Sequence, residues 1–212
     1  MYSGAQISLY PMADNFVQII LGSLSALDPY RPRFRIETDD LSTLIVGAPQ
    51  DLFPAMRDLH VAASRNSVHC VLHATISRGC PGEQPSSAIC TPIAGGRGHG
   101  STAPIPARVE EALANVASAP ELGQVVAAQF SLYPLGGGGS GHHHMDEIYG
   151  CIDFLKRSGC FGRAKNFCTT LRGDAGLVFA TLAEAFLRFG SPDGHLAIDL
   201  TVSANSPSKV DA

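Results

Sequence analysis

The sequence has few charged residues. They make up 16% of the 212-residue chain, well below the ~25% of an average soluble domain, while hydrophobic residues make up 45%. The formal net charge is −4, so the chain lacks the basic excess of a typical nucleic-acid-binding protein. We therefore expect a real hydrophobic core, no nucleic-acid partner, and a surface that is either uncharged or covered by a partner.

Signals for membranes, export and metal are also lacking. No apolar run approaches the ~18 residues of a transmembrane helix, and MYSGAQISLYP has no basic start followed by an apolar core, as a signal peptide would. None of the cysteines forms a CxxC pair that would suggest structural zinc. The six are Cys70, Cys80, Cys90, Cys151, Cys160 and Cys168. We expect no membrane insertion, no metal or other cofactor, and free thiols in the reducing cytoplasm.

What the chain does contain is an internal repeat. AQISLYPM (5–12) returns as AQFSLYPL (128–135), with six of eight positions identical at an offset of 123. VHCVLHATISRGCPGE (68–83) aligns with GHLAIDLTVSANSPSK (194–209) at an offset of 126. Two copies of roughly 80 residues indicate a tandem duplication rather than a solenoid.

Each copy predicts the same order of elements, β-α-β-β-α-β, from its strand alternation and helical spacing. In the first copy these elements are expected at 6–9, 16–27, 33–38, 42–47, 51–65 and 69–77. In the second they are expected at 129–132, 145–159, a hairpin within 162–170, 177–190 and 195–203. This order is that of a ferredoxin-like unit, so we predict an α+β tandem of two such domains.

The domain limits follow from the repeat. The first domain is expected at 1–84 and the second at 124–212. Residues 85–123 form a linker rich in Gly, Pro and Ser, with one possible short helix at 107–117.

An unusual segment, LGGGGSGHHHM (135–145), is placed by the repeat. It lies between the first strand and first helix of copy two, and is about five residues longer there than in copy one. We interpret it as a loop insertion rather than an engineered linker. The GxGxxG pattern at Gly136, Gly138 and Gly141 lacks the parallel βαβ unit and acidic residue of a dinucleotide site, and His142–His144 are interpreted as solvated loop residues.

Catalytic motifs are not evident. The sequence has no nucleophile elbow, HExxH or P-loop, and no pair of carboxylates recurs, because Asp39 and Asp40 correspond to Lys165 and Asn166. We therefore predict no catalytic residues and a protein that is not an enzyme.

Both copies keep the tetrapeptide SLYP, which has two interpretations. It could be a strand end with a packed tyrosine. Alternatively, the proline could leave the preceding strand groups free to bind the edge of a flat heterocycle, with a threonine hydroxyl nearby and the tyrosine as an aromatic wall. The candidate residues are Leu9, Tyr10 and Thr43, and their counterparts Leu132, Tyr133 and Thr169.

Four landmarks in order make the chain resemble the YkoF family of thiamin/hydroxymethylpyrimidine-binding proteins. They are the SLYPM-like strand ends, TDDLST (38–43), GCPGE (79–83) and SANSP (203–207). The resemblance implies ACT-like, ferredoxin-like domains, a homodimer and a pyrimidine ligand. It also implies ligand contacts at the Leu9 backbone and Thr43, and at Leu132 and Thr169. NFCTT around Thr169 and the Gly/His insertion depart from the family pattern.

Three functional hypotheses result. The first is cytoplasmic, non-enzymatic binding of thiamin or hydroxymethylpyrimidine, one site per repeat, in vitamin uptake or salvage and with a possible link to a vitamin transporter. The second is an ACT-type regulatory module that binds another small metabolite and acts on a protein partner. The third is an enzyme acting on a pyrimidine or related heterocycle.

Overall fold

The computed structural model describes residues 2–80, 100–135, 144–192 and 194–208. The first repeat runs β1 (Tyr2–Pro11), α1 (Phe16–Ser23), the 3-10 helix η1 (Leu24–Arg33), β2 (Arg35–Thr38), β3 (Thr43–Val46), α2 (Pro49–Ala63), the 3-10 turn η2 (Arg65–Ser67) and β4 (Cys70–Cys80). After α3 (Ile105–Val116), the second repeat runs β5 (Val125–Leu135), α4 (His144–Arg157), β6 (Phe161–Ala164), β7 (Thr169–Asp174), α5 (Ala175–Arg188) and β8 (His195–Ala204).

The predicted fold class is confirmed: the chain is an α+β tandem of two ferredoxin-like units. The helices lie within two residues of most predicted limits. The first strand of each repeat is longer than expected, with ten residues in β1 and eleven in β5. The first predicted helix ends as an α-helix at Ser23 and continues as η1, where Pro29 and Pro32 prevent regular α-helical hydrogen bonding.

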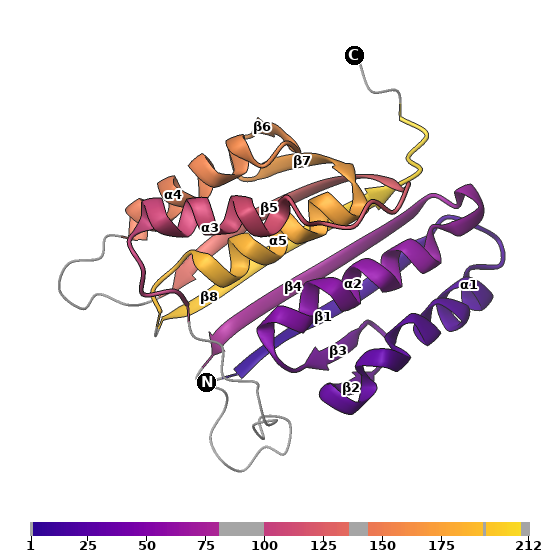
Figure 1. Cartoon of the computed structure of the whole chain (residues 1–212). Coiled ribbons are helices and arrows are strands. Elements are labelled where there is room, and N and C mark those ends of the chain that lie inside the picture. The colour runs from indigo at the N-terminus through magenta and orange to yellow at the C-terminus, as the bar shows by residue number, and fades with distance from the viewer. Residues whose placement is uncertain (1, 81–99, 136–143, 193, 209–212) are drawn as a thin grey trace, which may run out of the picture.

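The two repeats share one sheet. Its strand order is β2-β3-β1-β4-β8-β5-β7-β6, and every pairing is antiparallel. The central pair, β4 and β8, is the last strand of each repeat (Figure 1). Ala74 and Leu200, which are equivalent positions at the offset of 126, face each other across it. The repeats are therefore related by an approximate two-fold axis through the middle of the sheet.

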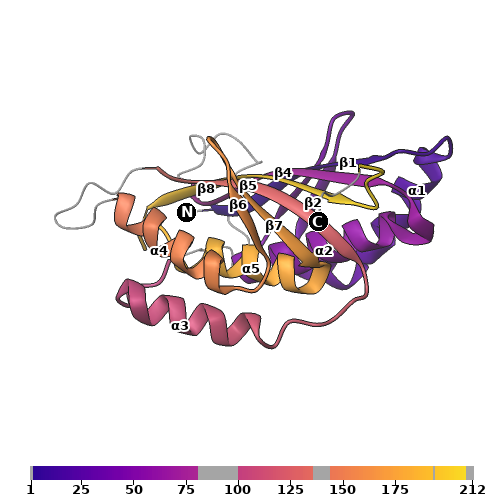
Figure 2. The ribbon, with the colours of Figure 1, turned by 90° about the horizontal axis from the view of Figure 1, so that it is seen from above.

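The helices cover one face of this sheet (Figure 2). The sheet residues beneath them are apolar and buried, such as Leu72 and Ile76 on β4 and Ile198 on β8. Residues alternate between faces along a strand, so the intervening positions, such as Thr75 and Asp199, lie on the opposite face and are exposed. This uncovered face is mostly polar along its central strands.

The approximate two-fold symmetry extends to side chains. On the uncovered face, His69 Nε2 lies 3.2 Å from Ser203 Oγ, and the equivalent pair, His195 Nε2 and Ser77 Oγ, lies at 2.7 Å. Each of these hydrogen bonds joins one repeat to the other, so they stabilise the shared sheet across β4 and β8.

The same symmetry is seen in the core, where α2 packs against α5. The Phe53 and Phe186 rings are 5.5 Å apart, and at the equivalent place the His60 and Phe179 rings are 6.2 Å apart. His60 thus occupies the position of a phenylalanine in the other repeat. It is fully buried and its Nε2 bonds the Cys70 carbonyl at 3.1 Å, while burial lowers the pKa of His60 to about 4.

The helix predicted between the repeats forms as α3 and lies outside α4 and α5, away from the sheet (Figure 2). The Arg108 guanidinium donates to both carboxylate oxygens of Glu147 on α4, at 2.8 and 2.7 Å, and to the Arg188 carbonyl at the end of α5. Both side chains of the ion pair are almost fully buried. Through this pair the linker helix is anchored to the second repeat.

The five cysteines in the described part of the chain are free thiols, and Cys90 lies outside it, as do the GxGxxG segment and His142–His143. His144 is exposed at the start of α4. Within the described ranges, no helix has the length and apolar character needed to cross a bilayer.

Candidate ligand-binding site

A free stretch of strand edge lies near the end of β1. The pairing of β1 with β3 stops at Ile7, opposite Thr43, whereas its pairing with β4 continues to Pro11. On the β3 side, the Ser3 carbonyl accepts a hydrogen bond from the Gly47 N–H. On the β4 side, the Met12 N–H donates to the His69 carbonyl. Because backbone groups alternate between the two sides of a strand, the N–H and C=O of Leu9 point toward β3 but beyond its end.

Proline limits how many donors this edge exposes. Pro11 is the next residue of β1 whose backbone faces the same side as Leu9, and it has no N–H. The edge therefore offers one N–H, that of Leu9, together with the Leu9 and Pro11 carbonyls. The sequence expectation that proline lies at a strand end holds for β1, while β5 continues one residue beyond Pro134.

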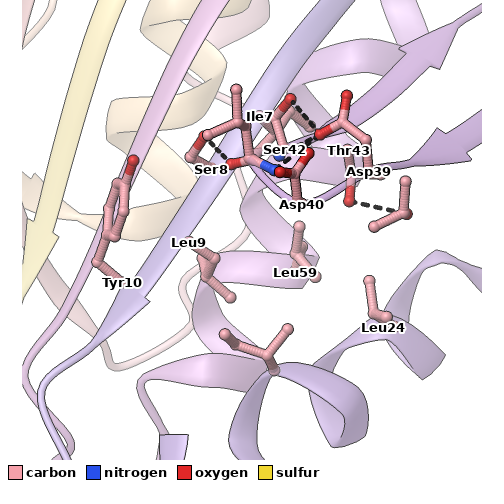
Figure 3. A pocket seen from close by; sticks show the side chains of 13 residues that line it. Ile7, Ser8, Leu9, Tyr10, Leu24, Asp39, Asp40, Ser42, Thr43 and Leu59 are labelled. Carbon is pink, nitrogen blue, oxygen red and sulfur yellow. Dashed lines mark hydrogen bonds between the residues drawn. The ribbon is translucent and has the colours of Figure 1, made fainter. Parts of the chain in front are cut away.

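A cavity of about 250 Å³ lies beside this edge. Figure 3 shows Leu9, Leu24 and Leu59 together on one side of it and the hairpin residues Asp39, Ser42 and Thr43 on the other. The aliphatic side chains come from β1, the α1–η1 segment and α2, and the polar ones from the connection between β2 and β3. An apolar pocket with a few convergent polar groups is the usual form of a small-molecule site.

The tip of the hairpin is held in place by side chains of β1. Ser8 Oγ donates to the Leu41 carbonyl at 3.0 Å and Gln6 Nε2 donates to Ser42 Oγ at 2.5 Å. Within the tip, Asp39 Oδ1 accepts bonds from the N–H groups of Leu41 and Ser42, both at 2.8 Å. These backbone bonds lower the pKa of Asp39, which keeps it ionised beside the cavity.

Thr43 lies at the junction of hairpin and strand edge. It is almost buried, and its Oγ1 lies 3.0 Å from Thr38 Oγ1 on the neighbouring strand. Only one proton can lie between the two oxygens, so the pair retains a second hydroxyl proton and free lone pairs for another partner.

Tyr10 also borders the cavity, but its side chain is half exposed. In Figure 3 its ring points away from Leu9 and Leu59, as expected for neighbouring residues on one strand. A role for Tyr10 as an aromatic wall therefore stays a prediction.

The second repeat has the same backbone frame. The pairing of β5 with β7 ends at Phe130, opposite Thr169, and the Gln124 carbonyl bonds Ala175 N–H on the β7 side. By alternation the backbone groups of Leu132 point beyond the end of β7, as those of Leu9 do beyond β3. Ser131 Oγ donates to the Phe167 carbonyl at 2.6 Å, which matches the bond of Ser8.

The side chains around the second edge differ. Ala164 stands where the first repeat has Thr38, so Thr169 lacks the neighbouring hydroxyl that Thr43 has. Cys168 replaces Ser42, and its Sγ lies 3.9 Å from Gln129 Oε1. The insertion of the second repeat falls largely in 136–143, outside the described residues.

The structure thus brings Leu9 and Thr43 to one cavity, and Leu132 and Thr169 to an equivalent edge. Sequence reasoning had not named the aliphatic residues Ile20, Leu24 and Leu59, which look like ordinary core positions. It had also missed the tethering role of Ser8, although the serine recurs in both SLYP motifs. Among the described residues no three His, Cys, Asp or Glu side chains gather as a metal site would require.

Comparison with known proteins identifies the family of the chain. The model of the YkoF-related family matches residues 2–83 and 125–209, which span both repeats. The chain belongs to this family. It is 30% identical over 209 residues to a protein of Bacillus subtilis (strain 168) named "Putative HMP/thiamine-binding protein YkoF", an alignment that covers 98% of this chain and 92% of that protein.

Proposed function

We propose that the chain binds thiamin or its hydroxymethylpyrimidine precursor without transforming it, one molecule at the β1 edge and one at the β5 edge. The observation that carries the proposal is the free backbone edge of Leu9, beyond the end of β3 and next to Thr43. The name of the Bacillus subtilis relative, with its HMP and thiamine ligands, supports the choice of ligand class.

The chemistry of an aminopyrimidine suits this edge. Its amino group donates and its ring nitrogens accept, all in the plane of the ring, which complements an N–H and a C=O on one strand. The faces of the ring are apolar and would lie against the aliphatic side chains of Leu24 and Leu59. The Thr43 hydroxyl would supply a further directional hydrogen bond.

The rest of thiamin would extend toward the hairpin tip. Its thiazolium ring is cationic, and Asp39 and Asp40 both border the cavity. A carboxylate within several ångströms of the cation would favour thiamin over a neutral heterocycle in the first repeat.

The setting of this activity is part of the proposal. We place the protein in the cytoplasm, as a carrier or buffer in vitamin uptake or salvage, with a vitamin transporter as its partner. We further propose a homodimer of ACT-like subunits, for which the uncovered sheet face offers a surface.

Calorimetric titration of thiamin into the wild type, Thr43→Val and Thr169→Val tests the proposal. We expect two molecules bound by the wild type and weaker binding at one site in each variant, because valine keeps the shape of threonine but not its hydroxyl. Absence of heat with both thiamin and hydroxymethylpyrimidine at millimolar concentration would contradict the proposal and favour an ACT-type regulatory module for another metabolite. Mass spectrometry of the recovered ligand tests whether it is left unchanged.

A further inference from the structure

The two hairpins that border the sites carry opposite charge. The first hairpin, residues 35–46, contains one basic and three acidic side chains, namely Arg35, Glu37, Asp39 and Asp40. The equivalent residues of the second repeat, 161–172, contain three basic side chains and no acidic one, namely Arg163, Lys165 and Arg172. The free edge of β5 beyond β7 matches that of β1 beyond β3, although β6 has a register shift between Phe161 and Ala164 that β2 lacks.

In the first hairpin the basic residue, Arg35, forms an ion pair. Arg35 Nη2 lies 2.5 Å from Glu37 Oε1, so its charge is largely balanced by that carboxylate. Asp39 and Asp40 then determine the charge that faces the cavity, which both residues line. Helix α1, on the other side of the cavity, contains no charged residue.

In the second hairpin a lysine takes the place of Asp39. The turn itself is retained, since Lys165 N–H donates to the Cys168 carbonyl at 2.8 Å just as Asp39 N–H donates to the Ser42 carbonyl at 3.0 Å. Across the described ranges, Lys165 has no carboxylate within ion-pairing distance.

Helix α4, which takes the place of α1 in the second repeat, carries three acidic residues. Glu147 is buried and paired with Arg108, and Asp153 lies 3.6 Å from Arg157. Asp146 is exposed in the first turn of α4. The hairpin beside the second edge therefore has the positive charge of Lys165 at the position where the hairpin beside the first edge has the negative charge of Asp39.

Resting on the proposed function, we infer that the two sites select ligands of opposite charge. The first site takes the aminopyrimidine that carries a cationic substituent, and the second takes a pyrimidine that carries a phosphate. Lys165 is the specificity-determining residue of the second site, as Asp39 and Asp40 are of the first. With both forms present, one chain would then hold two chemical forms of the same heterocycle, whereas thiamin alone would fill both sites, more weakly at the second.

Three probes that share the aminopyrimidine ring test the inference: neutral hydroxymethylpyrimidine, its phosphate, and cationic thiamin. Each is titrated into proteins with one site filled by a larger side chain. The first site is filled by Ile20→Phe and the second by Ile148→Phe, which aligns with Ile20 at the offset of 128 that follows the five-residue insertion. We expect the phosphate to bind better than thiamin in Ile20→Phe and the order to be reversed in Ile148→Phe.

Substitutions that remove single charges then test which residues determine the ligand preference. In Ile20→Phe, adding Lys165→Gln should weaken phosphate binding roughly threefold to tenfold, since a charge at a solvated pocket mouth acts through a high effective dielectric. Binding of neutral hydroxymethylpyrimidine should not change. Lys156→Gln, which removes an exposed lysine from the last turn of α4, is the matched control and should leave all three affinities unchanged. Asp39→Asn with Asp40→Asn should weaken thiamin at the first site by a similar factor.

The outcomes separate this inference from the proposed function. If neutral hydroxymethylpyrimidine binds both single-site proteins, but thiamin and the phosphate rank in the same order in each, the charge selection is wrong and the pyrimidine sites stand. Equal effects of Lys165→Gln and Lys156→Gln on phosphate affinity would likewise show that the charge selection is wrong. If none of the three probes binds the wild type, the proposed function itself fails, and this inference with it.

Discussion

Thr38 and Thr43 face each other across the first hairpin with their hydroxyl oxygens 3.0 Å apart, and the second repeat has no such pair, because Ala164 faces Thr169. The hydrogen bond orients the Thr43 hydroxyl beside the free edge of Leu9. A ligand that uses this hydroxyl would meet a preorganised group in the first repeat and a freely rotating one in the second.

Thr38→Ala should therefore make the first site resemble the second. We expect its affinity for hydroxymethylpyrimidine to fall roughly threefold, the effect of one neutral hydrogen bond, with the second site unchanged. Ala164→Thr is the converse substitution and should strengthen the second site. Calorimetric titration measures both, and equal affinities in wild type and Thr38→Ala would show that the threonine pair does not orient a ligand.

Filling the cavity should abolish the first site without unfolding the protein. Ile20 borders the cavity and is only partly buried, so Ile20→Phe places the added ring in the space that a ligand would use. We expect the number of thiamin molecules bound per chain to fall from two to one. Val17→Phe adds the same bulk at an exposed position on the same helix and should retain both sites. Two sites in Ile20→Phe would mean that the ligand lies elsewhere.

The buried His60 should make stability depend on pH. The unfolded chain protonates this histidine near its usual pKa of 6.5, whereas the folded protein does so only at about 4. As the pH falls from 6.5 to 4, the unfolded state gains a proton that the folded state cannot accept, and about 3 kcal/mol of stability is lost from this residue.

The variant His60→Phe, which copies the residue of the second repeat, separates this effect from that of the carboxylates. Urea denaturation at pH 7 and pH 4.5 should show a larger loss of unfolding free energy in the wild type than in the variant. Equal losses would mean that His60 is protonated in the folded protein well above pH 4.

The buried pair of Arg108 and Glu147 should be more important for stability than any surface ion pair. Arg108→Met leaves the Glu147 carboxylate buried without its guanidinium, and we expect a loss of about 3–5 kcal/mol in unfolding free energy. Arg157→Met removes an exposed partner of Glu110 and should cost less than about 1 kcal/mol. The double variant Arg108→Met/Glu147→Leu should recover part of the loss, and additive losses would show that the two side chains are not coupled.

Most secondary structure could be predicted because its signals are local. Helical spacing along α2 and α5 and alternation along β4 and β8 report which face of each element is apolar, and the repeat supplied each prediction twice. Element limits were less accurate. Polar and small residues at the start of β1 gave no strand signal, although pairing with β4 extends this strand to Tyr2.

The site was predictable only in outline. SLYP and the threonines could be found because both copies keep them, and the family resemblance gave them a role. Ile20, Leu24 and Leu59 could not be distinguished from core residues, since an aliphatic side chain has the same pattern whether it fills space or borders a cavity. The point at which β3 stops, and Leu9 is left without a strand partner, depends on the register between strands.

By itself, then, the sequence determined the duplication, the order of elements in each unit and the family, because these depend on short patterns and their spacing. The tertiary structure decided that the two units share one sheet through β4 and β8, and that the linker helix joins the second. Strand edges and helix faces can bind several partners, and which partner is bound depends on contacts between residues far apart in the sequence, such as Cys70 with Ala204 and Arg108 with Arg188. The two free strand edges arise within each repeat, where β3 and β7 end before β1 and β5 do, and the charge of each hairpin matters for a ligand only because the fold places it beside such an edge.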